Sequence, residues 1–246
     1  MDLQGKTVLV TGAALRIGRE IALDCAGRGA DVMVHYNRSR KPALKLKQAL
    51  EALGSKASLI RADFSSPHTG KVISRFLQDV DRQSNRIDCL INNASVFFAT
   101  PFKQITERHW DELITVNLKV PFFLSQKIGM RMMRQKAGKI INLVDWSSAR
   151  PSADYLPYGI SKAGLQAATA GLAKVLAPYV QVNSIAPGPI LPARGMTARQ
   201  SKFVLQRTLL KRYGDPRDIS RAVQFLIESD YVTGVCLPVD GGSSLV

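Results

Sequence analysis

The amino-acid sequence predicts an α/β protein built on one parallel, doubly wound sheet of about seven strands. Two observations lead to this prediction. Short β-branched runs alternate with longer helical patterns along the whole 246-residue chain, and no stretch rich in Pro, Gly or Ser divides it. Such alternation is typical of βαβ units, which keep their strands parallel and place helices on both faces of the sheet. We therefore expect a single domain over residues 1–246.

The predicted strands are short apolar runs, and the predicted helices are the longer segments between them. The strands are expected at residues 7–10, 32–34, 58–60, 87–91, 138–144, 180–185 and 235–239. The helices are expected near residues 17–28, 41–53, 68–84, 107–135, 158–177 and 216–228.

One segment, residues 189–213, interrupts the alternation. It contains no Asp or Glu, and its cations are Arg194, Arg199, Lys202, Arg207, Lys211 and Arg212. Loops longer than about 12 residues inside a compact domain are usually functional or disordered. We predict a substrate lid at about 189–213 whose charge favours an anionic tail, glutamyl or phosphorylated, on the substrate. The alternative is that these cations only face water.

The amino-acid composition indicates which classes of partner the protein can bind. With 34 Lys and Arg against 19 Asp and Glu, the net charge is +15, which attracts anions such as nucleic acid, an acidic membrane or a phosphorylated small molecule. The cations are dispersed without interleaved aromatics, which argues against nucleic-acid binding. The sequence contains no run of 18 apolar residues, so we expect no membrane span. Cys25, Cys89 and Cys236 are odd in number and far apart, so we expect no disulfide framework, no metal site and a cytoplasmic location.

The first predicted strand runs into a turn in which Gly12 and Gly18 flank Arg16 and Ile17. Glycines at such a turn let a pyrophosphate approach the N-terminus of the following helix. The spacing is Gly-x5-Gly and differs from the G-x-G-x-x-G fingerprint. By itself it fits an ordinary βα turn equally well.

The second predicted strand ends in His35-Tyr36-Asn37-Arg38-Ser39-Arg40, which contains no acid. An acid here would bind the ribose hydroxyls of an unphosphorylated dinucleotide. Arg16, Arg38 and Arg40 offer bidentate donors for a 2′-phosphate instead. NADPH is therefore the predicted cofactor, and a solvated basic loop is the alternative. Asp63 and Asn92-Asn93-Ala94-Ser95 also follow strands, at the ends where open α/β sheets bind ligands.

Tyr158 and Lys162 are four residues apart in a helical pattern and share one face of that helix. An ammonium about 4 Å from a phenol contributes roughly 4 kcal/mol at an effective dielectric near 20, or about 3 pKa units toward phenolate. We therefore predict that Lys162 lowers the pKa of Tyr158, so that the phenol donates and retakes a proton. A surface helix pair is the alternative.

Together with the glycine-rich turn and the Tyr158–Lys162 pair, four more motifs occur in order: Asn92-Asn93-Ala94, Asn117, Pro187-Gly188 and Asp240-Gly241-Gly242. In this set the chain resembles the short-chain dehydrogenase/reductase family. The resemblance implies a single-domain Rossmann fold, a nicotinamide cofactor, and catalysis by Asn117, Tyr158 and Lys162. It also implies a homotetramer, assembled through the helices at 107–135 and 158–177.

One position departs from that family. Its usual catalytic serine lies thirteen residues before the tyrosine, and here Asp145 stands in that place. Ser147 and Ser148 follow two and three residues later, an offset that we expect to point their side chains elsewhere. A carboxyl group accepts hydrogen bonds from an amino-substituted ring or, when protonated, relays a proton.

Three features are similar to the pteridine reductase branch of the family: Arg16 in the first turn, the His35-Tyr36-x-Arg38-Ser39 run, and Ser95-Val96-Phe97. The resemblance implies that Arg16 and Ser95 contact cofactor phosphates and that Phe97 sandwiches a flat pterin against the nicotinamide. Offset stacking on such a ring contributes about 0.5–1.5 kcal/mol beyond burial. A place for Phe97 in the core is the alternative.

The resulting hypothesis is an NADPH-dependent reductase that converts a dihydropterin, dihydrofolate or dihydromonapterin to its tetrahydro form. Tyr158 is expected to supply the proton, Lys162 to bind the nicotinamide ribose, Asp145 to orient the pterin and Asn117 to support a water chain. Expected cofactor contacts are Gly12, Arg16, Ile17, Gly18, His35, Tyr36, Asn37, Arg38, Ser39, Asp63, Phe64, Asn93, Ala94, Ser95, Tyr158, Lys162, Pro187 and Gly188. Expected substrate contacts are Arg16, Ser95, Phe97, Asp145 and Tyr158.

Three other functions remain open at the level of sequence. The first is a carbonyl reductase of 3-oxoacyl chains or small ketones, in which Ser147 or Ser148 replaces the missing serine. The second is a non-catalytic NADPH sensor, which the intact Tyr158 and Lys162 disfavour. The third is a basic module that binds nucleic acid.

Overall fold

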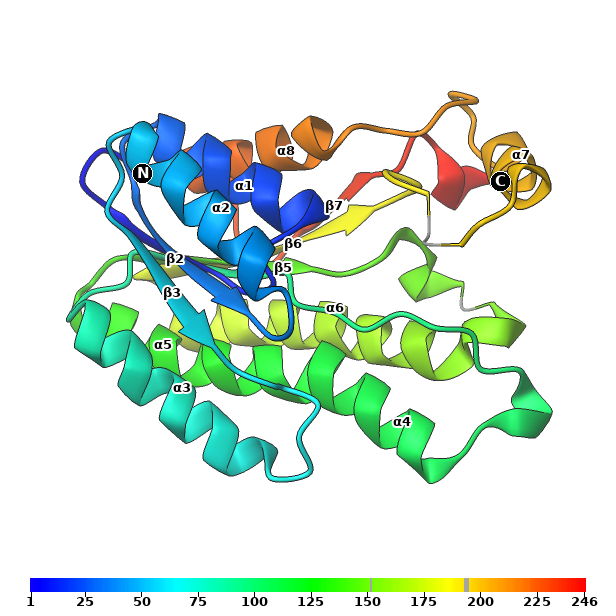
Figure 1. Cartoon of the computed structure of the whole chain (residues 1–246), viewed down its shortest axis with the longest axis horizontal. Helices are drawn as coiled ribbons and strands as arrows, with labels where there is room; N and C mark the ends of the chain where they lie inside the picture. Colours follow the sequence, from blue (N-terminus) through cyan, green and yellow to red (C-terminus); the bar gives the residue numbers. More distant parts are fainter. Residues whose placement is uncertain (151, 193–194) are drawn as a thin grey trace.

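A computed structural model of the chain describes residues 1–150, 152–192 and 195–246. Its centre is a parallel sheet of seven strands in the order β3-β2-β1-β4-β5-β6-β7 (Figure 1), which confirms the predicted fold class. The strands are β1 (Thr7–Val10), β2 (Asp31–Tyr36), β3 (Ala57–Arg61), β4 (Cys89–Asn92), β5 (Gly138–Leu143), β6 (Val180–Pro187) and β7 (Cys236–Val239).

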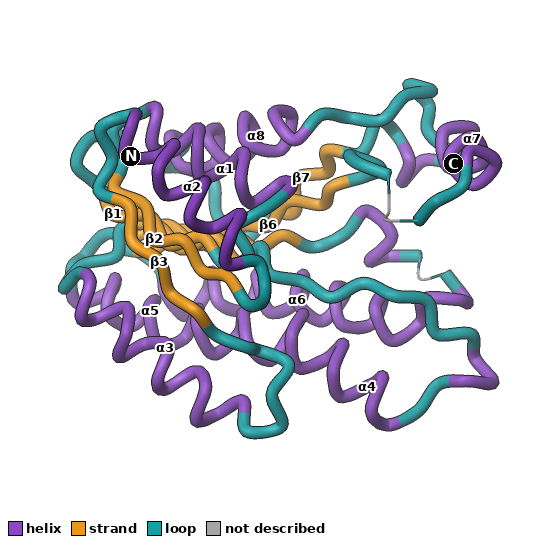
Figure 2. The backbone as a smooth tube through the Cα atoms, viewed as in Figure 1, coloured by secondary structure: helices purple, strands orange, loops and turns teal. Residues whose placement is uncertain are grey.

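Helices cover both faces of this sheet (Figure 2). One layer holds α1 (Arg16–Gly27), α2 (Arg40–Ala52) and α8 (Pro216–Glu228), and the other holds α3 (Thr69–Gln83), α4 (Glu107–Ile114), α5 (Val120–Arg134) and α6 (Leu156–Leu176). No described helix combines the length and the apolar character needed to cross a membrane.

The first strand shows why the strands are apolar throughout. Val8 and Val10 belong to the core beneath α1 and α8, whereas Leu9 belongs to the core beneath α3 and α5. Successive side chains of a strand point to opposite faces, so a sheet covered on both sides needs apolar residues at every position. β1 also lies between β2 and β4, where the strand order reverses and α/β sheets open a crevice.

The helix predicted at 107–135 is interrupted. Between α4 and α5 the chain forms a π-helical turn, η2 (Thr115–Lys119), which contains Asn117. Pro121 follows at the start of α5 and has no N–H to donate to the carbonyl of Asn117, four residues earlier. Such π-helical turns are frequent at functional sites.

In segment 189–213 the structure shows one helix, α7 (Ala198–Gln206), which begins with a capping box of Thr197 and Gln200. Beyond α7, the amide of Leu210 donates to the carbonyl of Gly241 at 3.1 Å, which joins this segment to the C-terminal turn. Arg194 lies outside the described residues. The role of the segment as a lid stays a prediction.

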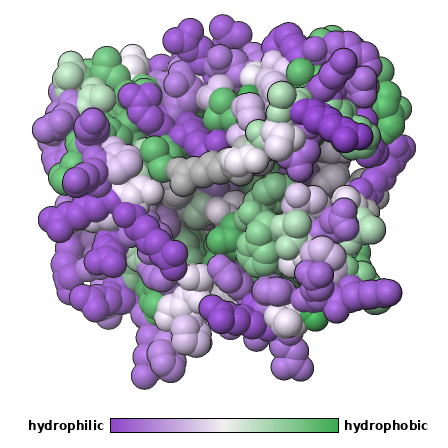
Figure 3. Space-filling view, turned by 45° about the vertical axis from the view of Figure 1, so that its right-hand side comes forward, coloured by the Kyte–Doolittle hydropathy of each residue, from purple (hydrophilic) through white to green (hydrophobic). Residues whose placement is uncertain are grey.

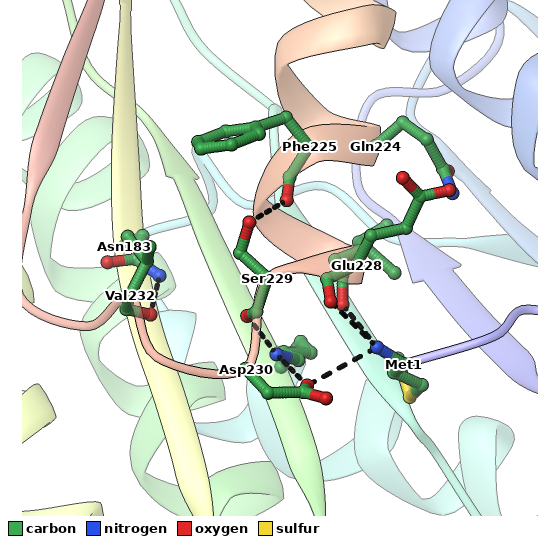
Figure 4. Close-up of polar contacts among 10 residues, drawn as sticks. Met1, Asn183, Gln224, Phe225, Glu228, Ser229, Asp230 and Val232 are labelled. Atoms are coloured by element: carbon green, nitrogen blue, oxygen red, sulfur yellow. Dashed lines mark hydrogen bonds and ion pairs between the residues drawn. The ribbon is translucent and has the colours of Figure 1, made fainter.

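Polar contacts tie the segment after α8 to the neighbouring strands, and Figure 4 shows Ser229, Asp230, Asn183 and Val232 of this region. Lys139 of β5 is buried, and its Nζ donates to the carbonyl of Ser229 at 2.6 Å and to Asp230 Oδ1 at 3.0 Å. Nearby, Asn183 Nδ2 donates to the carbonyl of Val232 at 2.9 Å. These contacts hold the connection between α8 and β7 against the sheet.

Candidate active site

The candidate catalytic residues lie at the carboxyl ends of the strands. Asp145 follows β5, Tyr158 and Lys162 are in α6, and Asn117 is in η2. Figure 3 shows the face at this end of the sheet, where hydrophobic residues gather around a central hollow and hydrophilic residues cover most of the surroundings. Among the described residues, no three His, Cys, Asp or Glu side chains are grouped to hold a metal ion.

Asp145 makes contact with the tyrosine. Its Oδ2 accepts a hydrogen bond from the Tyr158 hydroxyl at 2.9 Å, and its Oδ1 accepts bonds from the amide and the hydroxyl of Ser147 at 2.8 and 2.5 Å. Asp145 is also the N-cap of the short helix η3 (Trp146–Ala149). The cap explains why an acid fits here, since its side chain satisfies an otherwise unpaired amide.

The prediction that Lys162 lowers the pKa of Tyr158 is wrong for this structure. Burial, together with the charge and hydrogen bond of Asp145, raises the pKa of the phenol well above its ordinary value. Lys162 Nζ lies 5.8 Å from the centre of the Tyr158 ring and donates to the carbonyl of Leu143 at 2.8 Å. Burial lowers the pKa of Lys162 to about 8, although the Asp145 charge opposes this shift. Tyr158 is therefore a protonated hydrogen-bond donor.

Asn117 ties the loop after β4 to α6. Its side-chain oxygen accepts hydrogen bonds from the Ser95 hydroxyl at 3.0 Å and the Val96 amide at 2.9 Å. Its Nδ2 lies 3.0 Å from the Val96 carbonyl and 3.2 Å from Ser161 Oγ. The side chain is fully buried, so Asn117 fixes the loop that carries Ser95 and Phe97.

Phe97 is outside the core, because 52% of it is exposed. Its ring stacks on Tyr155, with centroids 4.7 Å apart and an interplanar angle of 1°. The Tyr158 ring meets it edge-on at 4.8 Å. An aromatic surface thus stands beside the Tyr158 hydroxyl and the Asp145 carboxylate.

The glycine-rich turn is packed tightly against the end of β4. Gly12 has φ +64°, and a Cβ there would lie 2.9 Å from the Cα of Ala94. A Cβ on Gly18 would lie 2.5 Å from both Asn93 Nδ2 and the carbonyl oxygen of Gly12. Asn93 Nδ2 donates to the carbonyls of Thr11 and Gly12 at 2.9 and 3.1 Å, so both glycines are needed for this close approach.

Two helix N-termini open near this turn. Neither Leu15, which precedes α1, nor Ser39, which precedes α2, caps its helix with a side chain. The first amides of these helices therefore remain free to bind an anion. Arg16 and Arg38 are exposed beside them. The Arg16 guanidinium donates to the carbonyls of Leu191 and Pro192 at 3.3 and 3.2 Å, which links the turn to the start of segment 189–213.

Three residues expected to contact the cofactor have buried side chains: His35, Tyr36 and Phe64. His35 Nδ1 accepts the Gly12 amide at 3.0 Å, and its Nε2 lies 3.2 Å from the Ala62 carbonyl. Phe64 stacks on the imidazole with centroids 4.3 Å apart. His35 thus supports the glycine-rich turn through the Gly12 amide, and Phe64 packs against its imidazole.

The remaining expected contacts line the same edge of the sheet. Asp63 Oδ1 accepts hydrogen bonds from Asn37 Nδ2 at 2.9 Å and from Ser65, whose donors lower the pKa of the carboxyl. Gly188, after Pro187, approaches β7 so closely that a Cβ would lie 2.5 Å from the Cα of Asp240.

Comparison with known proteins identifies the family of the chain. Residues 6–202 match the family model described as short chain dehydrogenase. The chain belongs to the short chain dehydrogenase family. The match includes Asp145, Tyr158 and Lys162, so the family's scaffold carries the acid that departs from its usual motif.

Similar proteins of this family carry different names. The 3-oxoacyl-(acyl-carrier-protein) reductase FabG of Staphylococcus epidermidis is 33% identical over 242 residues, which cover 96% of this chain and 98% of that protein. The 5-keto-D-gluconate 5-reductase of Escherichia coli K12 is 32% identical over 252 residues, which cover 98% and 96%. The structure of FolM alternative dihydrofolate reductase 1 from Brucella suis, in complex with NADP, has a TM-score of 0.90 and 31% identity, covering 100% of this chain and 97% of that one.

Sequence reasoning missed three residues of the candidate site. Ser147 contacts the Asp145 carboxylate although its offset led us to expect otherwise, Tyr155 stacks on Phe97, and Ser161 lies beside Asn117. The Asp-x-Ser spacing was an available signal, since an acid that caps a helical turn accepts bonds from residues two positions on. Tyr155 and Ser161 carry no comparable local signal.

Proposed function

We propose that the chain is an NADPH-dependent reductase of a pterin, a dihydropterin, dihydrofolate or dihydromonapterin, which it converts to the tetrahydro form. The observation that carries the proposal is the 2.9 Å hydrogen bond from the Tyr158 hydroxyl to Asp145 Oδ2. A carboxylate accepts hydrogen bonds from a ring that bears amino and N–H groups, whereas a ketone offers it no donor. The similarity to a solved alternative dihydrofolate reductase supports the same substrate class.

The residues around the glycine-rich turn fit the cofactor. Gly12 and Gly18 leave the backbone open to a pyrophosphate, and the uncapped N-terminus of α1 supplies amides to bind it. Arg38 and the uncapped N-terminus of α2 suit a 2′-phosphate, since no acid stands at the end of β2. NADP in the Brucella suis neighbour supports this preference. When bound, NADPH supplies the hydride.

Tyr158 holds the proton for this reaction. Because its pKa is raised, the phenol remains protonated until a better acceptor replaces Asp145 Oδ2. A ring amino group that donates to the second acceptor site of Oδ2 brings the ring beside the phenol, within reach of the Tyr158 hydroxyl. Lys162, buried beneath Tyr158, supplies donors for the nicotinamide ribose.

Phe97 and Asn117 position the substrate. The exposed face of Phe97 suits a planar ring, and its stack on Tyr155 holds it in place. Asn117 holds the loop that bears Phe97 through the hydrogen bonds to Ser95 and Val96. The proposed water chain behind Lys162 begins at this asparagine.

The test compares NADPH oxidation by the wild-type enzyme and Asp145→Ser with dihydrobiopterin, dihydromonapterin, dihydrofolate and an acetoacetyl thioester. A charge-assisted hydrogen bond contributes about 1.5–3 kcal/mol. We therefore expect Asp145→Ser to reduce kcat/KM for pterins by roughly 10-fold to 150-fold. Unchanged pterin turnover in Asp145→Ser would contradict the role of the carboxylate.

A second candidate is a carbonyl reductase of 3-oxoacyl chains or small ketones. The names of the Staphylococcus epidermidis and Escherichia coli relatives favour it. In that reaction Tyr158 donates to a carbonyl oxygen, and Asp145 competes for the same hydrogen. Turnover of the acetoacetyl thioester but of no pterin would select this candidate, and Asp145→Ser would then raise the rate.

A further inference from the structure

The two oxygens of Asp145 have different partners. Oδ2 accepts one hydrogen bond, from Tyr158, whereas Oδ1 accepts two, from the amide and the hydroxyl of Ser147. A carboxylate offers about four lone-pair sites, two on each oxygen. Oδ1 is therefore saturated, and the remaining acceptor site lies on Oδ2, next to the tyrosine.

We propose that Ser147 is a positioning residue that holds Asp145 so that Oδ2 faces both Tyr158 and the amino-substituted ring of the pterin. The inference rests on the proposed function. The amide of Ser147 holds the carboxylate as a helix cap, and the hydroxyl adds a second donor to the same oxygen. Without the hydroxyl, only the Ser147 amide donates to Oδ1. The carboxylate then rotates more easily, because rotation breaks one hydrogen bond to Ser147 instead of two.

The neighbouring serine provides a matched control. Ser148 lies in the same turn, but its hydroxyl donates to the backbone carbonyl of Asp145 at 2.6 Å and makes no contact with the carboxylate. Removing either hydroxyl deletes one hydrogen bond between η3 and its N-cap residue, Asp145. Only the change at Ser147 alters the donors around Oδ1.

The kinetic test measures kcat and KM for dihydropterin reduction between pH 5 and 9 in Ser147→Ala, Ser147→Thr and Ser148→Ala. We expect Ser147→Ala to lower kcat/KM roughly ten-fold at every pH, because the carboxylate is no longer held with Oδ2 toward the ring. Ser147→Thr, which keeps a hydroxyl, should restore the wild-type kcat/KM, and Ser148→Ala should keep it. An unchanged kcat/KM in Ser147→Ala, or an equal loss in Ser148→Ala, would overturn the proposal.

A second readout needs no substrate. In protein labelled with 13C at the ζ carbon of tyrosine, the Tyr158 signal, assigned by its loss in Tyr158→Phe, reports the hydrogen bond from the phenol to Asp145 Oδ2. At one fixed pH its chemical shift should change in Ser147→Ala and stay in place in Ser148→Ala; no change in Ser147→Ala would overturn the positioning role. If the wild-type enzyme reduces no pterin, the proposed function fails, while this measurement still decides what Ser147 does to Asp145.

Discussion

At the scale of single residues, one substitution changes what the tyrosine does. Asp145 in place of a serine puts a negative charge next to the Tyr158 phenol, and this charge acts with burial to raise the pKa of the phenol. A neutral serine hydroxyl exerts no such electrostatic effect. The site therefore keeps a protonated phenol and an acceptor side by side, an arrangement suited to a substrate that brings its own N–H donors.

His35 predicts how the stability of the fold depends on pH. Burial lowers its pKa from 6.5 to about 4, and the Gly12 amide needs the unprotonated Nδ1 as an acceptor. The unfolded chain binds a proton near pH 6.5 and the folded chain only near pH 4, so the free energy of unfolding rises with pH between these values. We expect about 3 kcal/mol of stability to be lost as the pH falls from 6.5 to 4.

Urea unfolding at pH 4.5, 5.5, 6.5 and 7.5 measures this dependence. His35→Gln is the control, because its amide can accept and donate but does not titrate in this range. The slope between pH 4.5 and 6.5 should be smaller in the variant. Equal slopes in both proteins would show that His35 does not cause the effect.

At the scale of elements, the turn between β1 and α1 depends on glycine. In Gly18→Ala the new Cβ would lie 2.5 Å from the carbonyl oxygen of Gly12, which belongs to the backbone and has no rotamer by which to yield. We expect a loss of about 1–3 kcal/mol in the free energy of unfolding, typical of overpacking. The affinity for NADPH, measured by fluorescence titration, should fall as well.

Gly27 is the matched control within the same helix. It ends α1, and a Cβ there would meet no atom within 4 Å. Gly27→Ala should raise the free energy of unfolding by about 0.5–1 kcal/mol, because alanine restricts the unfolded chain. NADPH affinity should remain unchanged. If both variants are equally stable, the close contact at Gly18 is not limiting.

The interruption between α4 and α5 also belongs to this scale. A continuous helix over residues 107–135 would direct Asn117 by regular helical geometry alone. The π-helical turn inserts an irregularity at this residue, and its side chain reaches Val96 and Ser161. The candidate site therefore depends on a local departure from the helical period.

At the scale of the whole molecule, the net charge is +15, and several of the cations lie exposed on α7 and next to it. Arg199, Lys202 and Arg207 are exposed there. If these cations attract an anionic tail, KM for a glutamylated pterin should rise several-fold with added salt, because salt screens exposed charges. KM for the tail-less pterin should change little. Steady-state kinetics across a salt series measure the difference, and equal, salt-insensitive KM values would contradict this proposal.

Assembly is a separate property of the whole molecule. Apolar side chains are exposed on the helices through which the family resemblance predicts a tetramer, among them Trp110, Phe123, Met130 and Ile160. Burial of such residues between subunits removes apolar surface from water. The homotetramer stays a prediction that light scattering can test against the chain mass of 27.0 kDa.

Much of the fold follows from local patterns in the sequence. Apolar runs such as residues 7–10 predicted strands, because a strand covered on both faces must be apolar at every position. Gly12, Gly18 and the strand ends predicted the edge of the sheet at which the candidate site lies. Tyr158 and Lys162 share a helix, so their four-residue spacing placed them near each other.

Only the tertiary structure decided the chemistry around Tyr158. The sequence places Lys162 four residues from the tyrosine, but in the structure the lysine donates to the Leu143 carbonyl. The phenol instead contacts Asp145, which follows β5. Likewise, His35 and Phe64 occupy the core although they stand at strand ends. Spacing along one helix specifies a shared face, whereas hydrogen-bond partners and pKa shifts depend on what packs against that face, and packing is a property of the folded chain.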